Sequence, residues 1–200
     1  VAMNELSNHD HSRFLTRTNH KVGRTNTLGP QAAEQGINKA VFREGVVIQM
    51  TWTGAPTIYY GDEAGVCGFT DPDNRRTYPW GHEDQVLLAF HKDIIRLRRE
   101  NEELRSGSLK MLESDYNFIS YGRFNRKGQC AVLINNNNHP ITKEIHVWEI
   151  GTPKTGKMKV ILQSRDDGYC MEGAEYEIKA GKILIEMPQT SATILKFIEE

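Results

Sequence analysis

The chain has 200 residues, 38% of them hydrophobic, and its 25 Lys and Arg residues nearly balance its 26 Asp and Glu residues, which leaves a net charge of −1. This length can form one large domain or two small ones with a buried core, which excludes a small protein held together by disulfides. The balanced charge gives no general electrostatic attraction to nucleic acid or to anionic lipid, so we expect neither as a partner.

The first half of the chain is predicted to alternate strands and helices. Val1–Leu6 forms a short extended stretch, and Pro30 stands in the first turn of a helix whose apolar residues recur at helical spacing. The β-branched and aromatic run Thr57–Tyr60 is typical of a buried strand, and Asp84 caps a second helix that carries an apolar stripe. The order strand, helix, strand, long loop, helix is the repeat unit of a parallel α/β fold.

After residue 104 the pattern changes to short strands separated by turn signals. Phe118–Phe124 and Gln129–Asn135 flank a four-residue connection that ends in Gly128, which is typical of a β-hairpin. Further strands are predicted at 141–148, 158–163, 175–179, 182–187 and 192–198. About eight short strands, with apolar and polar residues alternating so that one face contacts solvent, favour an antiparallel β-sandwich over residues 105–200. This sandwich would be a separate domain from the α/β domain over residues 1–104.

Two polar clusters follow the two predicted parallel strands. The first is Asn8–Arg13, and the second joins Gly61–Glu63 to the long loop Asp71–Trp80. Because α/β folds place their sites beyond the carboxyl ends of parallel strands, we expect the two clusters to be neighbours. Carboxylates stabilise an oxocarbenium-like transition state, and a Trp face can stack on a sugar ring. The clusters therefore favour a sugar ligand, with His and Arg side chains contacting its hydroxyls.

Some of these residues also have an ordinary structural interpretation. Asp10 could cap a turn or the following helix, and its spacing alone favours that role. Glu63 could form a salt bridge with Arg75 or Arg76 instead of contacting a substrate. The residues alone leave both alternatives open.

Three strings, in this order and spacing, resemble the α-amylase family of glycoside hydrolases. They are Leu6–Asp10, Gly54–Glu63 and Asp71–Trp80. The resemblance is nearest to neopullulanases, cyclomaltodextrinases and oligosaccharide α-glucosidases, and it extends over the whole chain. It implies that residues 1–104 are the last two βα units of a (β/α)8 barrel and that residues 105–200 are the family's C-terminal β-sandwich.

The resemblance also implies roles for individual residues. Asp10 matches the aspartate that stabilises the transition state, and His9 matches the histidine that binds glucose in the first donor subsite. Arg75 and Trp80 would contact substrate from the Asp-Pro-x-x-Arg loop, and Glu63 is a further candidate contact. The family's nucleophile and general acid follow earlier barrel strands, so we expect both upstream of this chain and expect the isolated chain to be inactive.

The implied parent protein is a retaining glycosidase that hydrolyses α-glucosidic bonds in maltooligosaccharides, cyclodextrins or starch-like glucans. The resemblance implies no cofactor for this parent protein. A structural Ca²⁺ is common in the family but is not assignable to these residues. The family is also compatible with a homo-oligomer. Two rivals stay open: a non-catalytic carbohydrate-binding module, and a metal-dependent hydrolase with His9, Asp10 and His11 as ligands. We expect no metal, because the two histidines lack a third well-spaced ligand.

The remaining signals concern location. The longest apolar runs have about five residues, whereas a membrane-spanning helix needs about twenty. The first residues do not begin with Met and lack the basic start and apolar stretch of a signal peptide. Cys67, Cys130 and Cys170 are odd in number and have neither a CxxC pair nor metal-ligand spacing. We therefore expect a fragment of a larger protein in the reducing cytoplasm, with no membrane partner.

Overall fold

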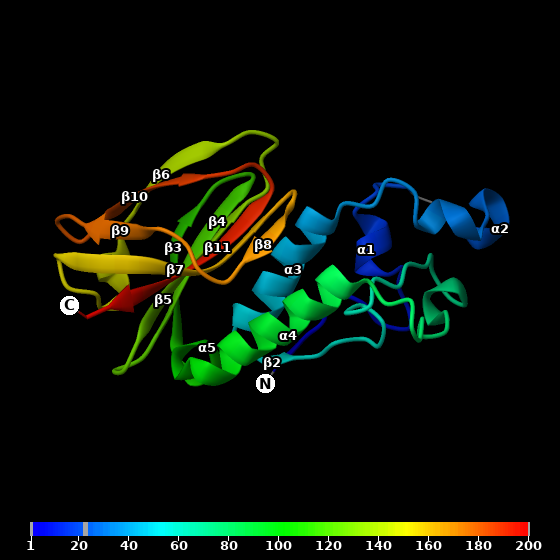
Figure 1. The fold of residues 1–200 in the computed structure, drawn as a ribbon, viewed down its shortest axis with the longest axis horizontal. Helices are drawn as coiled ribbons and strands as arrows, with labels where there is room; N and C mark the ends of the chain where they lie inside the picture. Colours follow the sequence, from blue (N-terminus) through cyan, green and yellow to red (C-terminus); the bar gives the residue numbers. More distant parts are fainter. Residues whose placement is uncertain (1, 22–23, 200) are drawn as a thin grey trace.

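A computed structural model describes residues 2–21 and 24–199 of the chain (Figure 1). Its first half contains two short parallel strands that pair with each other. Strand β1 (Met3–Asn4) pairs with β2 (Ala55–Pro56), with Met3 opposite Ala55. The segments that follow both strands therefore leave the same edge of this sheet. The elements between them are α1 (Phe14–Arg17), α2 (Thr25–Leu28), the 3-10 helix η1 (Pro30–Ala33) and α3 (Lys39–Thr51).

The single helix predicted from Pro30 onward is divided in the structure. Pro30 begins η1, whereas α3 begins after Asn38, whose Oδ1 accepts hydrogen bonds from the backbone N–H groups of Ala40 and Val41 at 2.9 and 3.1 Å. An Asn at this position satisfies backbone donors that a helix start leaves unpaired, so it sets a new beginning. The helix ends at Thr51, shortly before Gly54 and Pro56.

The prediction of a buried strand at Thr57–Tyr60 is wrong. Strand β2 ends at Pro56. After the Thr57 N–H, which donates to the Asn4 carbonyl at 2.9 Å, the segment leaves the strand, and its residues are partly buried or, at Tyr60, exposed. The rings of Tyr59 and Tyr60 instead enclose the Arg13 guanidinium, whose carbon lies 4.1 and 4.8 Å from the two ring centroids. Aromatic composition favours a strand locally, but here the rings cover a buried charge by cation–π contact.

The second predicted helix is confirmed as α4 (Gln85–Glu100). Asp84 Oδ1 accepts hydrogen bonds from the backbone N–H groups of Val86 and Leu87 at 3.1 and 3.0 Å. The apolar stripe of this helix is buried, while Lys92, Arg96 and Arg99 face solvent. The 3-10 turn η2 (Asp73–Arg75) in the long loop and α5 (Glu102–Ser106) after α4 are among the short elements that the sequence does not predict.

The antiparallel sandwich predicted for the second half is confirmed. The strands are β3 (Ser108–Ser114), β4 (Phe118–Phe124), β5 (Gln129–Asn135), β6 (Ile141–Ile145), β7 (Gly156–Arg165), β8 (Gly168–Cys170), β9 (Glu175–Ile178), β10 (Ile183–Met187) and β11 (Ser191–Ile198). The main sheet has the order β3-β4-β5-β11-β7-β8, with β9 also paired to β7, and β10 pairs with β6 in a second sheet. The strand predicted over 141–148 is too long, because the 3-10 helix η3 (Val147–Ile150) replaces its end.

The main sheet is buried on both faces. Helices α3 and α4 lie side by side, and α3 packs on β7 and β11 (Figure 1). On β5, Val132 and Ile134 belong to the core shared with these helices, whereas Ala131 and Leu133 belong to a second core under β6 and β10. This alternation is the period-2 pattern of a strand with two apolar faces. The helices and one face of the main sheet therefore share a hydrophobic core, and the other face of the sheet has a second core of its own.

Polar contacts also join the helices to the sheet. Thr51 Oγ1, at the end of α3, lies 2.6 Å from the Tyr121 hydroxyl on β4, and the Arg123 guanidinium donates to the Thr51 carbonyl. In the described parts of the chain, no helix is long and apolar enough to cross a bilayer.

Glu44 on α3 gives the fold a pH dependence that can be measured. Its side chain is buried, and its Oε1 has no hydrogen-bond partner among the described residues. Burial, helped by the negative charge of Asp166, raises the pKa of Glu44 to about 8 from its ordinary 4.5. The folded protein then holds a proton that the unfolded chain releases, so the free energy of unfolding falls as pH rises from about 4.5 to 8.

We expect Glu44→Gln to remove much of this loss, because the amide cannot ionise. Urea unfolding between pH 6 and 8 should show a falling free energy of unfolding for the wild type, by at most about 1.4 kcal/mol per pH unit, and a flatter profile for the variant. Glu100→Gln, at the exposed end of α4, is the control and should keep the wild-type slope. Equal slopes for the wild type and Glu44→Gln would contradict the assignment.

Candidate functional site

The segment after β1 forms a tight polar turn. Asn8 Oδ1 accepts hydrogen bonds from the backbone N–H groups of Asp10 and His11 at 2.9 and 3.2 Å. His9 Nε2 lies 3.3 Å from Asp10 Oδ1, and 60% and 67% of these two side chains are exposed. Asn8 caps the turn, and the first N–H of α1 donates to Ser7 Oγ, so the capping alternative for Asp10 is wrong.

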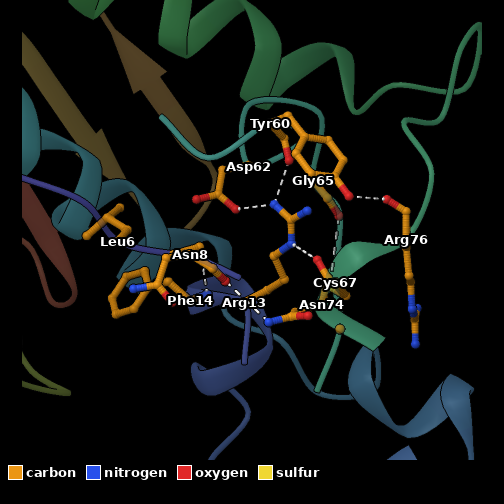
Figure 2. Close-up of polar contacts among 12 residues, drawn as sticks. Leu6, Asn8, Arg13, Phe14, Tyr60, Asp62, Gly65, Cys67, Asn74 and Arg76 are labelled. Carbon is orange, nitrogen blue, oxygen red and sulfur yellow. Dashed lines mark hydrogen bonds and ion pairs between the residues drawn. The ribbon is translucent and has the colours of Figure 1, made fainter. Parts of the chain in front are cut away.

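Arg13 is fully buried and joins three segments of the chain (Figure 2). Its Nη1 donates to the Tyr60 carbonyl at 2.6 Å and to Asp62 Oδ1 at 3.0 Å, and its Nε donates to the Asn74 carbonyl at 2.8 Å. Burial raises the pKa of Asp62 to about 6, against the opposing effects of Ser7 and Arg13. Arg13 therefore anchors loops through its buried guanidinium.

Asn74 brings the long loop onto the turn that carries Asp10. This side chain is fully buried, and its Nδ2 donates to the His11 carbonyl at 2.9 Å and to the Asn8 carbonyl at 3.3 Å. Arg75, the next residue, donates from Nη2 to the His9 carbonyl at 3.4 Å. The predicted proximity of the two clusters is thereby confirmed.

The charge of Arg75 also lies close to this turn. Its guanidinium pairs with Asp71, and this hydrogen bond raises the pKa of Arg75, with smaller contributions from more distant groups that include Asp10. His9, Asp10 and Arg75 thus form one exposed polar group supported by buried residues.

Glu63 and Trp80 lie in a neighbouring aromatic group. Burial and the negative charge of Glu63 raise the pKa of the Tyr78 hydroxyl, and the Tyr78 and Trp80 rings are 4.5 Å apart. Trp80 is 80% exposed, so one of its faces is free to stack. No hydrogen bond or ion pair among the described residues links Glu63 or Trp80 to the His9–Asp10 turn.

The salt-bridge alternative for Glu63 is wrong. Arg75 pairs with Asp71, while Arg76 pairs with Asp73 at 2.9 Å and with Glu34 at 2.6 Å. Each arginine of this loop is therefore neutralised by a carboxylate other than Glu63, which leaves Glu63 beside Tyr78.

A transition-metal site has no ligand set in the described ranges. No group of three or more His, Cys, Asp or Glu side chains converges there. We expect purified protein to contain no stoichiometric zinc or manganese bound through His9 and His11. Elemental analysis should give the same metal content for the wild type and for the double variant His9→Ala, His11→Ala. One equivalent of metal per chain that disappears in the double variant would contradict this expectation.

The chain is similar to several named proteins and matches one family model. The family model for the "Alpha amylase, C-terminal all-beta domain" matches residues 110–198. An amylopullulanase from Thermoanaerobacter thermohydrosulfuricus is 32% identical over 196 residues, covering 96% of this chain and 13% of that protein. Neopullulanase 2 from Thermoactinomyces vulgaris is also 32% identical over 196 residues, covering 96% of this chain and 28% of that protein.

The fold has solved counterparts as well. The α-amylase from Geobacillus thermoleovorans, solved as a complex with acarbose, superimposes with a TM-score of 0.78 at 20% identity. This superposition covers 100% of the present chain and 39% of that α-amylase. The chain thus spans well under half the length of each of these proteins.

Proposed function

Because the chain belongs to the α-amylase family of glycoside hydrolases and contains its C-terminal all-β domain, we propose that the full-length protein hydrolyses α-glucosidic bonds. Its substrates would be maltooligosaccharides, cyclodextrins or starch-like glucans. The similarity to amylopullulanase and neopullulanase over nearly the whole chain supports this substrate class.

We further propose that residues 1–104 complete a (β/α)8 barrel and that residues 105–200 are the C-terminal sandwich. The parallel pairing of β1 with β2 and the order strand, helix, strand, helix support this assignment. A two-stranded sheet is marginal on its own, so β1 and β2 need further strands beside them. The full length of the relatives leaves ample room for those strands.

One observation carries the proposal: Asp10 is exposed on a hydrogen-bonded turn just past the carboxyl end of β1, and among the described residues it pairs with no arginine. Asp62, Asp71 and Asp73 all pair with arginines, whereas the ion-pair neighbour of Asp10 is His9. A free, fixed carboxylate can stabilise the positive charge that develops on a sugar ring as its glycosidic bond breaks.

The other candidate residues would bind and orient the sugar. His9 would hold the ring beside Asp10, and Arg75 would contact hydroxyls from the opposite loop. Trp80 would stack on a more distant sugar unit, with Glu63 supporting the aromatic group. Retaining hydrolysis also needs a nucleophile and a general acid about 5 Å apart, which we assign to barrel strands outside this chain.

Assay of the full-length protein tests the proposal. It should release reducing sugar from maltooligosaccharides or cyclodextrins with retention of the anomeric configuration, whereas the 200-residue chain alone should show no turnover. Saturable glucan binding without any turnover by the full-length protein would favour a carbohydrate-binding module and contradict the proposal.

A further inference from the structure

We propose that Asn74 and Arg13 are positioning residues that hold Asp10 in place for the reaction. This inference rests on the proposed function of Asp10 and assigns residues that would act through it without touching the substrate. It concerns one connected set of contacts, which runs from the Arg13 guanidinium through Asn74 to the backbone of the turn (Figure 2).

Asp10 has little to fix its own side chain. Its ion-pair contact in the described chain is His9, which is itself 60% exposed. The direction of the carboxylate therefore depends on the backbone of residues 8–11. Asn8 Oδ1 holds that backbone from inside the turn, through the N–H groups of Asp10 and His11.

Asn74 holds the same backbone through the carbonyl groups of the turn. Its Nδ2 donates to the carbonyls of Asn8 and His11, so the two bonds bracket His9 and Asp10. A buried amide that donates to one carbonyl at each end of a short turn leaves the turn little freedom to move. Asn74 was not singled out from the sequence, because an Asn in a polar loop carries no signal of burial.

Arg13 fixes Asn74 in turn. Its Nε donates to the Asn74 carbonyl, and its Nη1 donates to the Tyr60 carbonyl and to Asp62. The guanidinium therefore fixes the loop that contains Asn74 relative to the segment that follows β2. A guanidinium offers several donors in a fixed fork, which a lysine ammonium cannot reproduce. Its complete burial leaves it no contact with a substrate.

The consequence for catalysis is geometric. A displacement of about 1 Å in a charged group can cost about a hundredfold in rate, even when the change lies outside the reacting atoms. Loss of the Asn74 or Arg13 contacts should therefore lower kcat more than it raises KM, because the stabilisation that Asp10 provides grows as charge develops in the transition state.

The test compares two equally buried asparagines in the full-length protein. Asn74→Asp turns the Nδ2 donor into an oxygen that faces two carbonyls. Asn135→Asp makes the same change on β5, where Nδ2 donates to the Pro188 carbonyl at 2.7 Å and the side chain is also fully buried. We expect Asn74→Asp to lower kcat by at least about tenfold with a change in KM below about threefold. Asn135→Asp should keep a normal kcat per folded molecule.

Hydrogen exchange supplies a readout that does not depend on activity. The amides of Asp10 and His11 should exchange faster in Asn74→Asp and at the wild-type rate in Asn135→Asp. If Asn74→Asp does not fold, Arg13→Lys keeps the charge beside Asp62 and should show the same split between kcat and KM. Normal kcat in either folded variant, or equal loss of kcat in both asparagine variants, would overturn the inference.

These outcomes separate the inference from the proposed function. If Asp10→Asn keeps a normal kcat, the proposed role of Asp10 fails, whatever the exchange rates are. If Asp10→Asn loses activity while Asn74→Asp keeps both its kcat and its exchange rates, only the positioning role fails.

Discussion

Asp10→Asn in the full-length protein is expected to lower kcat by about a hundredfold to several thousandfold and to change KM little. The amide keeps the shape and the reach of the carboxylate but removes its charge. Charge develops on the sugar only as the glycosidic bond breaks, so a fixed carboxylate contributes most at that moment, on the order of 3 to 5 kcal/mol. Steady-state kinetics on a maltooligosaccharide, together with a thermal melt, measure both consequences.

A matched control for this variant lies in the sandwich. The Asp115 side chain is 67% exposed, the same as that of Asp10, and its neighbour is Lys143 at 3.7 Å. Asp115→Asn should therefore leave kcat unchanged. A normal kcat for Asp10→Asn would mean that Asp10 has no role in catalysis.

Phe42→Ala is expected to lower the free energy of unfolding by roughly 3 to 5 kcal/mol and to destabilise both halves of the chain together. Phe42 is completely buried on α3, and its ring centroid lies 6.0 Å from those of Phe14 and His91. The core around it includes Tyr121 and Val132 of the sandwich. A cavity at Phe42 therefore weakens the contact between the helices and the main sheet.

Urea unfolding and hydrogen exchange test this expectation. Protection of amides on α3 and on β5 should fall by the same free energy in Phe42→Ala. Tyr116→Ala, which removes a ring that is 96% exposed, should change the free energy of unfolding by less than about 0.5 kcal/mol. Loss of protection on α3 alone, with β5 unchanged, would show two independent units in place of one shared core.

Local signals predicted some of these elements well. The bounds of β4 and β5 are confirmed, because continuous β-forming residues flank a connection that ends in Gly128. The start of α4 is also confirmed, because Asp84 is a strong N-cap before an apolar stripe. Strand β8 was missed, since its three residues form a strand only by pairing with β7.

The failures arose where distant residues decide the conformation. Thr57–Tyr60 has strand composition, yet its tyrosines surround Arg13, which lies more than forty residues earlier in the chain. Nothing in the local sequence indicates that Arg13 is buried or that Asn74 reaches the turn after β1. The proximity of the two clusters was predictable, because parallel strands place their carboxyl ends at one edge of the sheet. The buried contacts of Arg13 and Asn74 that fix this proximity were not, because they join residues far apart in the sequence.

The most direct test of the central claim is a crystal structure of the full-length protein with acarbose, the compound present in the Geobacillus thermoleovorans α-amylase structure. We expect acarbose in a cleft at the carboxyl edge of β1 and β2, with the Asp10 carboxylate and His9 Nε2 both within hydrogen-bond distance of the same ring. Acarbose bound only elsewhere on the protein, with Asp10 and His9 left in solvent, would contradict the account.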